Sequence, residues 1–70
     1  MKKYVGDLIK SRRELLGLKQ PDLEEISGVS TRTIQLVENG KANPSLDTLL
    51  KIASPLGLTM QLLLKETGFE

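Results

Sequence analysis

Apolar residues recur at helical spacing in the segments that precede the glycines of this chain. Before Gly17 they fall near one face of a helix, which we predict over about residues 4–16. Pro21 stands where a second short helix can begin, at about residues 20–27, because the first turn of a helix does not need the N–H that proline lacks. Glycine favours the left-handed cap at a helix end, and the glycines in such positions are Gly17, Gly28, Gly40 and Gly57.

Two serines mark the starts of two further helices. Ser30 is a favourable N-cap for a third helix over about residues 31–38. Ser45 caps a fourth helix that carries apolar residues up to Leu56. Pro55 should distort or terminate the last turn of that helix, because proline removes a backbone donor and crowds the preceding turn. The pattern predicts an all-α fold, a compact bundle of four to five short helices.

The tail over residues 58–66 fits two alternatives. Its apolar residues alternate along the chain, which is the period of a strand, and the rival is a fifth helix from Met60 to about Lys65. We favour the strand. A lone strand would leave its backbone groups unpaired, so we predict that it pairs with the same strand of a second copy about a two-fold axis. The side chains expected on this dimer face are Leu58, Met60, Leu62 and Leu64.

Length and composition indicate one small domain over residues 1–70. A chain of 70 residues has a marginal core and, without cysteine, no disulfide to support it, so a homodimer is the expected support. The chain also lacks histidine, which with cysteine supplies the commonest general base, thiol nucleophile and metal ligands. We therefore predict that the protein is not an enzyme and holds neither a cofactor nor a metal.

The charge of the chain is nearly balanced. The 10 Lys and Arg residues oppose 9 Asp and Glu residues, which gives a net charge of +1 at pH 7. This balance is not the strongly basic character that marks many nucleic-acid binders. No apolar run approaches the length of a membrane span, and the first lysines are not followed by the apolar segment of a secretory signal. We expect a cytoplasmic protein without membrane contact.

The second and third predicted helices are joined by a short turn, Gly28-Val29-Ser30. This arrangement is typical of a helix-turn-helix, in which glycine allows the bend and the next apolar residue fills the space between the helices. A plain helical hairpin has the same spacing and is the structural alternative. The residues expected between the two helices are Leu23, Ser27, Val29, Ile34 and Val37.

Short motifs around this turn favour the helix-turn-helix. In chain order they are Gly28-Val29-Ser30, Glu38-Asn39-Gly40 and Asn43-Pro44-Ser45. At this spacing they resemble the phage-repressor and Cro-like (XRE) family over about residues 5–58. The resemblance implies a helical bundle whose third helix enters the major groove of DNA, usually as a dimer on a palindrome. Within the family, the antitoxins of Hip-type kinase toxins look similar, since they place a strand at the position of residues 57–62.

The third helix carries the candidate base-reading side chains. Arg can bond to guanine and Gln to adenine through two hydrogen bonds, and Thr can contact a thymine methyl group. The resemblance implies that Thr31, Arg32 and Gln35 read bases, and Leu36 is a further candidate; on the residues alone, this polar face could simply be solvated. Phosphate contacts are expected from the resemblance and from the anion preference of helix N-termini, at Lys19, Gln20, Ser30, Thr33, Asn39, Lys41 and Asn43.

Two positions depart from the family pattern. Lys19 replaces the usual Ser or Thr and cannot cap the second helix through its side chain, although it can reach a phosphate. Glu24 replaces the usual Ala, so its stem must lie across the contact between two helices while its carboxylate turns outward. The resemblance also implies a partly buried ion pair between Arg13 and Glu38, which would tie the first helix to the third.

Two functions remain open at this point. The first is a homodimeric repressor that binds a palindromic operator in double-stranded DNA, with or without a kinase-like toxin as partner. The second is a protein-interaction module or antitoxin that neutralises a partner with little DNA binding of its own. The balanced charge and Glu24 favour the second, whereas the first is favoured by the ordered set Gln20, Thr31, Arg32, Gln35 and Lys41. Binding that weakens steeply with salt would separate them, because neutralised phosphates release counterions.

Overall fold

The computed structural model describes residues 2–63, which form four α-helices and one 3-10 turn and contain no β-strand. The all-α fold predicted from the sequence is therefore confirmed. The first helix begins two residues earlier than the pattern predicted, and the second and third have the predicted bounds. The elements are α1 (Lys2–Leu15), α2 (Gln20–Ser27), α3 (Thr31–Glu38), α4 (Leu46–Ala53) and the 3-10 turn η1 (Ser54–Leu56).

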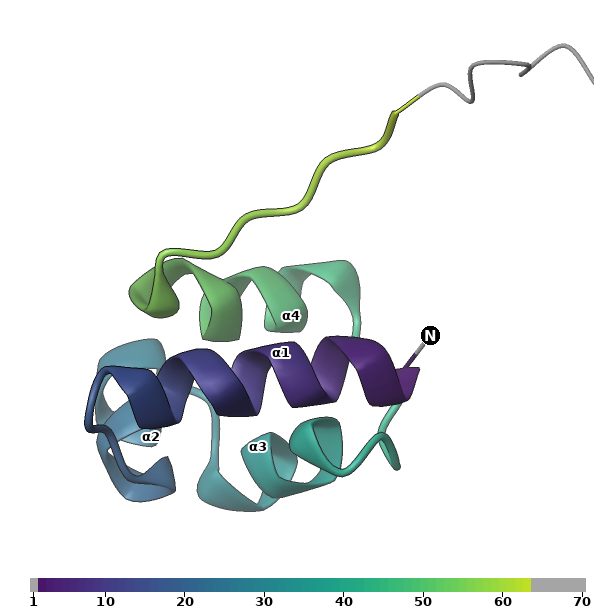
Figure 1. The fold of residues 1–70 in the computed structure, drawn as a ribbon. Coiled ribbons are helices and arrows are strands. Elements are labelled where there is room, and N and C mark those ends of the chain that lie inside the picture. The colour runs from purple at the N-terminus through teal and green to yellow at the C-terminus, as the bar shows by residue number, and fades with distance from the viewer. Residues whose placement is uncertain (1, 64–70) are drawn as a thin grey trace, which may run out of the picture.

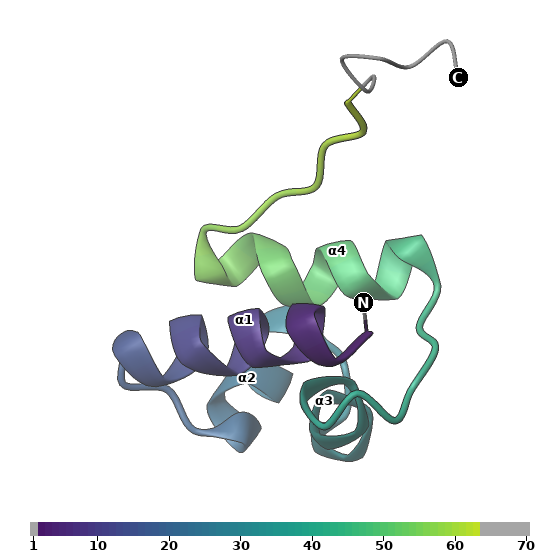
Figure 2. The ribbon, with the colours of Figure 1, turned by 45° about the vertical axis from the view of Figure 1, so that its right-hand side comes forward.

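The helices are arranged around α1 (Figure 1). In this view α4 lies above α1, and α2 and α3 lie below it. A view turned by 45° shows the same order, with α3 still on the side of α1 away from α4 (Figure 2). In both views the residues after η1 leave the bundle beside α4 and run away from α3. The tail and the third helix therefore lie on opposite sides of the molecule.

Each helical element contributes a buried apolar side chain to a single core. Ile9, Leu23, Ile34, Ile52 and Leu56 come from α1, α2, α3, α4 and η1 in that order, and each is at most 2% exposed. Full burial of a side chain of this size stabilises the fold by about 1.5–3 kcal/mol. Leu23 is the single buried residue of α2, so this short helix depends on the rest of the core for its stability.

Gly6 allows the backbone of α1 to touch the end of α3. A β-carbon at this position would overlap the carbonyl oxygen of Val37 and would lie 2.7 Å from the carbonyl oxygen of Glu38. No real side chain tolerates such a distance to a backbone atom, so the two helices can approach this closely only where α1 has glycine. The close approach fixes the last turn of α3 against the first half of α1.

The fourth helix is shorter than the sequence pattern predicted. The pattern carried it to Leu56, whereas the α-helix ends at Ala53 and the next three residues form η1. Pro55 accounts for the change, as predicted, because it cannot donate the backbone hydrogen bond that an α-helix needs. The side chain of Arg12 holds this end against α1, since its Nε donates a hydrogen bond to the carbonyl oxygen of Leu56 at 3.1 Å.

The tail is neither a helix nor a strand where the structure describes it. Leu58 is half-buried against the core, whereas residues 59–63 are exposed and have no regular secondary structure. The fifth helix that was the rival interpretation is therefore absent over residues 60–63. The strand does not form within one chain, and its pairing with a second copy stays a prediction. Of the predicted dimer face, Leu58, Met60 and Leu62 are described, and Leu64 lies outside the described residues.

Substituting Gly6 with alanine should destabilise the fold, because the added methyl group forces α1 and α3 apart. Overpacking of this kind costs about 1–3 kcal/mol. We expect Gly6→Ala to lower the urea midpoint of unfolding, and Ser11→Ala, an exposed position on the same helix, to leave it close to the wild-type value. A Gly6→Ala midpoint equal to or above that of the wild type would contradict the close approach.

Candidate nucleic-acid interface

The turn between α2 and α3 has the geometry of a helix-turn-helix. Gly28 ends α2 in the left-handed conformation, with φ at 77°, and its N–H donates to the carbonyl oxygen of Glu24 at 2.8 Å. Val29 follows and is 8% exposed, so it fills the space between the helices as predicted. Ser30 then caps α3, because its hydroxyl oxygen accepts a hydrogen bond from the N–H of Thr33 at 3.1 Å. These contacts fix the direction in which α3 leaves the turn.

The outer face of α3 brings together the predicted base-reading residues. Arg32 and Gln35 are exposed on this helix, and Thr31 and Leu36 are half-buried beside them. Ile34 is fully buried on the opposite face. The amphipathic division leaves a polar strip of α3 available to a partner, while the apolar strip holds the helix on the core.

A buried ion pair fixes the end of α3 to α1. Arg13 donates from Nε to Oε2 of Glu38 at 2.7 Å and from Nη2 to Oε1 at 3.0 Å. Its third nitrogen, Nη1, donates to the carbonyl oxygen of Leu18 at 2.8 Å. Arg13 is 8% exposed and Glu38 is 2% exposed, so water competes little for these hydrogen bonds. The hydrogen bonds to Glu38 raise the pKa of Arg13, so the guanidinium group stays protonated.

Gln20 belongs to the same network, which the sequence analysis missed. The residue was assigned to a phosphate, but its side-chain Nε2 donates to Oε1 of Glu38 at 3.1 Å, and the residue is half-buried. Glu38 therefore accepts hydrogen bonds from α1 and from the start of α2. An inward glutamine cannot be distinguished from an outward one by sequence spacing, because position 20 lies at the edge between the two faces.

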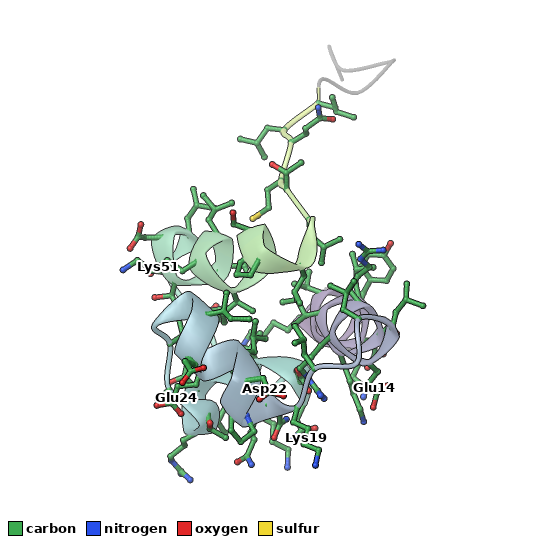
Figure 3. All side chains as sticks on the ribbon, turned by 90° about the vertical axis from the view of Figure 1, so that its left-hand side faces the viewer. Glu14, Lys19, Asp22, Glu24 and Lys51 are labelled. Atoms are coloured by element: carbon green, nitrogen blue, oxygen red, sulfur yellow. The ribbon has the colours of Figure 1, made fainter. Side chains whose placement is uncertain are left out.

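Lys19 stands before α2 and leaves its side chain free for solvent or a phosphate. In Figure 3 it points away from α4 and from the tail. Its backbone N–H donates to Oδ2 of Asp22 at 2.8 Å, so the carboxylate three residues ahead supplies the capping contact that the Lys19 side chain was not expected to make. The spacing of three residues between Lys19 and Asp22 is a sequence signal from which this contact could have been predicted.

The remaining predicted phosphate residues lie at the two ends of α3. At its start, the hydroxyl groups of Ser30 and Thr33 are hydrogen-bonded to each other at 3.0 Å. At its end, Asn39, Lys41 and Asn43 are exposed in the loop that leads to α4. These positions flank the outer face of α3 without crossing it. Their contact with phosphates stays a prediction.

Glu24 turns its carboxylate outward, as its position required, and there it meets the first residue of α3. Its Oε1 accepts hydrogen bonds from Oγ1 of Thr31 at 2.6 Å and from the backbone N–H of Thr31 at 2.9 Å. These two donors hold the pKa of the Glu24 carboxyl below its ordinary value. The carboxylate also lies at the positive end of the α3 dipole. From the sequence, Glu24 was expected only to disturb the contact between the two helices, whereas in the structure it joins α2 to α3.

Comparison with known proteins identifies the family. A family model described as helix-turn-helix matches residues 9–63. An uncharacterized HTH-type transcriptional regulator of Haemophilus influenzae is 45% identical over 58 residues, which cover 83% of this chain and 58% of that protein. A second uncharacterized HTH-type transcriptional regulator, from Sinorhizobium fredii, is 36% identical over 59 residues, which cover 84% of this chain and 77% of that protein. The ImmF control region 10 kDa protein of Bacillus phage phi105 is 36% identical over 61 residues, which cover 87% of this chain and 68% of that protein.

The chain therefore belongs to the helix-turn-helix family, in its XRE class of phage-repressor and Cro-like DNA-binding regulators. It spans little more than half of the Haemophilus relative and 16% of a matching putative regulatory protein of Methanocaldococcus jannaschii. No solved structure matches the chain significantly. Within residues 2–63, no helix is long and apolar enough to cross a membrane.

Removal of the Arg13 side chain should strongly destabilise the protein, because it leaves the buried carboxylate of Glu38 without its charged partner. Breaking a buried pair in this way costs about 3–5 kcal/mol. We expect Arg13→Ala to lower the urea midpoint far more than Lys10→Ala, which removes an exposed charge from the same helix. Equal midpoints for the two variants would show that the pair does not hold the helices together.

The cap by Glu24 should make stability depend on pH in the acid range. The pKa of the Glu24 carboxyl is lower in the folded chain than in the unfolded chain. At a pH between these two pKa values, the native state therefore binds fewer protons than the unfolded state. The stabilisation by the Glu24 carboxylate is complete at a pH above the pKa of this group in the unfolded chain. It is lost as the pH falls through the pKa of the group in the folded chain. We expect the difference in urea midpoint between wild type and Glu24→Gln to shrink as the pH falls through this window.

The matched control for this experiment is Glu25→Gln, which removes the same charge from the same helix at an exposed position. It should show no comparable convergence with the wild type. If the difference between the wild type and Glu24→Gln were the same at neutral and acid pH, the carboxylate would not be acting as the cap.

Proposed function

We propose that this protein is a sequence-specific transcriptional repressor that binds a palindromic operator in double-stranded DNA as a homodimer. The observation that carries the proposal is the outer face of α3. Arg32 and Gln35 project from a helix whose inner face is fixed by Ile34 in the core and by the ion pair of Glu38 with Arg13. A rigid helix with exposed Arg and Gln fits the major groove, where these side chains distinguish guanine and adenine from the other bases.

The positive charges near α3 support the same proposal. Lys19 precedes α2 and Lys41 follows α3, so an exposed ammonium group stands near each end of the helix-turn-helix. Phosphate contacts of this kind set the position of a protein on DNA, and the base contacts then select the sequence. The small net charge of the chain does not oppose this, because affinity depends on where the charges lie rather than on their sum.

The tail and the groove beside it support the homodimer. Leu62 is fully exposed and Met60 is 46% exposed, although both are apolar. Beside the tail are two apolar hollows of about 250 and 240 Å³, and Val5, Leu49 and Met60 line both. A second tail that pairs with the first would cover exposed apolar side chains and satisfy the backbone groups of both segments. The tail lies away from α3, so both recognition helices would remain accessible (Figure 2).

The second candidate function is the neutralisation of a protein partner, such as a kinase-like toxin in the manner of Hip-type antitoxins. The exposed leucines of the tail favour it, because a surface of this kind can bind a different protein as well as a second copy. The two functions differ in their dependence on DNA. A repressor needs the outer face of α3, whereas a partner-neutralising module does not.

Substitutions on α3 should separate base reading from phosphate binding. We expect Arg32→Ala and Gln35→Ala each to weaken binding to the selected operator by about 1–3 kcal/mol and to relax the preference at one base position. Lys41→Ala should weaken binding to all sequences alike and reduce the salt slope by about one unit. Binding is measured by fluorescence anisotropy on operator and random duplexes over a range of salt concentrations.

The matched control is Lys51→Ala, which removes an exposed charge from α4, on the other side of α1. It should bind as the wild type does. Should the wild type bind no duplex in a salt-dependent way, the repressor would be excluded in favour of the partner-neutralising module. Wild-type affinity of Arg32→Ala for both operator and random duplex would show that α3 is not the reader.

If the tail is a strand, adjacent residues lie on opposite faces, so the dimer can be tested at one residue with the next residue as its control. Leu62 lies on the predicted dimer face and Leu63 on the opposite face, and both are exposed in the single chain. We expect Leu62→Glu to convert the dimer to a monomer in sedimentation experiments and to weaken operator binding, since like charges would meet across the two-fold axis. Leu63→Glu should stay dimeric. A dimeric Leu62→Glu would exclude pairing through this face.

A further inference from the structure

The contact between Glu24 and Thr31 places a negative charge beside a predicted base-reading residue. Thr31 opens α3, and the carboxylate of Glu24 in α2 accepts from both its hydroxyl and its backbone N–H. Figure 3 shows Glu24 on α2, on the side of the molecule away from the tail. A carboxylate at this position opposes a phosphate. The carboxylate therefore suggests that this end of α3 faces the bases of the groove and not the phosphates of the DNA backbone.

The chemistry of the two side chains determines which of them is the donor in the 2.6 Å hydrogen bond between Thr31 and Glu24. An ionised carboxylate has only acceptor atoms, so the hydroxyl group of Thr31 must be the donor. A hydroxyl has one hydrogen and two lone pairs. With that hydrogen directed at Glu24, the oxygen of Thr31 can offer only lone pairs to DNA. A threonine without such a neighbour could instead rotate its hydroxyl and act as a donor or an acceptor.

The backbone at the start of α3 is occupied in the same way. The N–H of Thr31 donates to Glu24, and the N–H of Thr33 donates to the hydroxyl oxygen of Ser30. Free amides of this kind are what make a helix N-terminus attractive to phosphate. Since these two amides are used within the chain and a carboxylate stands beside Thr31, the Thr31 end of the helix is not available to a phosphate. Thr31 is left to face a base.

Resting on the proposed function, we infer that Glu24 is a positioning residue that sets base preference through Thr31. The pair presents acceptors only, so the base that contacts Thr31 must present a donor in the major groove. The exocyclic amines of cytosine and adenine are the donors available there, while guanine and thymine present acceptor atoms. At the base position that meets this hydroxyl group, the preferred bases are therefore cytosine and adenine.

Replacement of Glu24 by glutamine tests this inference sharply. A glutamine has nearly the same size, and its carboxamide oxygen can still accept from the backbone N–H of Thr31, although the negative charge is lost. A neutral carboxamide attracts the hydroxyl hydrogen of Thr31 less strongly than a carboxylate does, so in this variant the hydroxyl group is free to rotate and to donate to a base. We expect Glu24→Gln to shift the preference at one base position from cytosine or adenine towards guanine or thymine, by about tenfold, with the other positions unchanged.

The experiment is a selection from a randomised duplex library, followed by affinity measurements on the selected sites and on their single-base variants. It compares the wild type with three variants. Glu24→Gln should change the preferred base at one position, and Thr31→Val, which keeps the shape but removes the hydroxyl, should lose the preference there. Glu25→Gln is the matched control: it removes the same charge from the next residue of α2 and should select the wild-type site.

The outcomes distinguish this inference from the proposed function. If the wild type selects a palindrome and both Glu24→Gln and Thr31→Val keep its preference at every position, the inference is wrong while the repressor stands. A change with Glu25→Gln as large as that with Glu24→Gln would also overturn it, since the effect would then come from net charge. If the wild type selects no sequence, both fail. Thermal unfolding shows whether Glu24→Gln is folded; if it is not, Thr31→Val decides.

Discussion

The position of α3 depends above all on the buried contact between Arg13 and Glu38. It joins α1 to the last residue of α3, and Gln20 adds the start of α2 to the same carboxylate. Two charges below the surface are costly to remove from water, and their attraction compensates only with good geometry and complete hydrogen bonding. Both conditions are met, since the guanidinium makes two hydrogen bonds to Glu38 and one to the carbonyl oxygen of Leu18. Apolar packing tolerates small rotations of a helix, whereas a two-point hydrogen bond of this kind fixes one orientation.

The two ends of α3 are held by different means, and the difference matters for what the helix can present. Gly6 lets the backbone of α1 approach the C-terminal end of α3 beside the buried pair, so that end is fixed by contact and by charge. The N-terminal end is held by Ser30 and Glu24, whose oxygen atoms accept from backbone N–H groups at the start of α3. Both restraints act from the inner side or the edge of the helix. The outer strip with Arg32 and Gln35 is consequently presented in a defined orientation without contributing to the core.

The helices were predictable from the sequence, whereas several side-chain partners were not. Apolar spacing and the caps at Ser30 and Ser45 give the helix bounds because they act within a few residues of one another. The inward turn of Gln20 depends on a carboxylate 18 residues away, which no local pattern specifies. The fourth helix shows the same limit, since Pro55 predicted a distortion near its end but not the conversion of the last turn to a 3-10 turn. The tail was ambiguous for another reason: its alternation is that of a strand, but residues 59–63 have no regular secondary structure in the single chain, and pairing with a second copy stays a prediction.

The distribution of acidic residues explains why net charge is a poor guide to this surface. Asp22 and Glu24 lie close to the proposed DNA face, and each accepts a backbone N–H at the start of a helix, from Lys19 and Thr31 respectively. Glu38 is neutralised by Arg13 inside the molecule. These three carboxylates therefore organise the helix-turn-helix, and a count of charges does not show that Glu38 is buried with its partner while Asp22 and Glu24 are exposed. Electrostatic attraction to DNA depends on the field at the surface where the phosphates would lie, so the positions of Lys19, Arg32 and Lys41 matter more there than the sum over the chain. A chain of net charge +1 can in this way place Lys19, Arg32 and Lys41 on or near α3 while its carboxylates serve the fold.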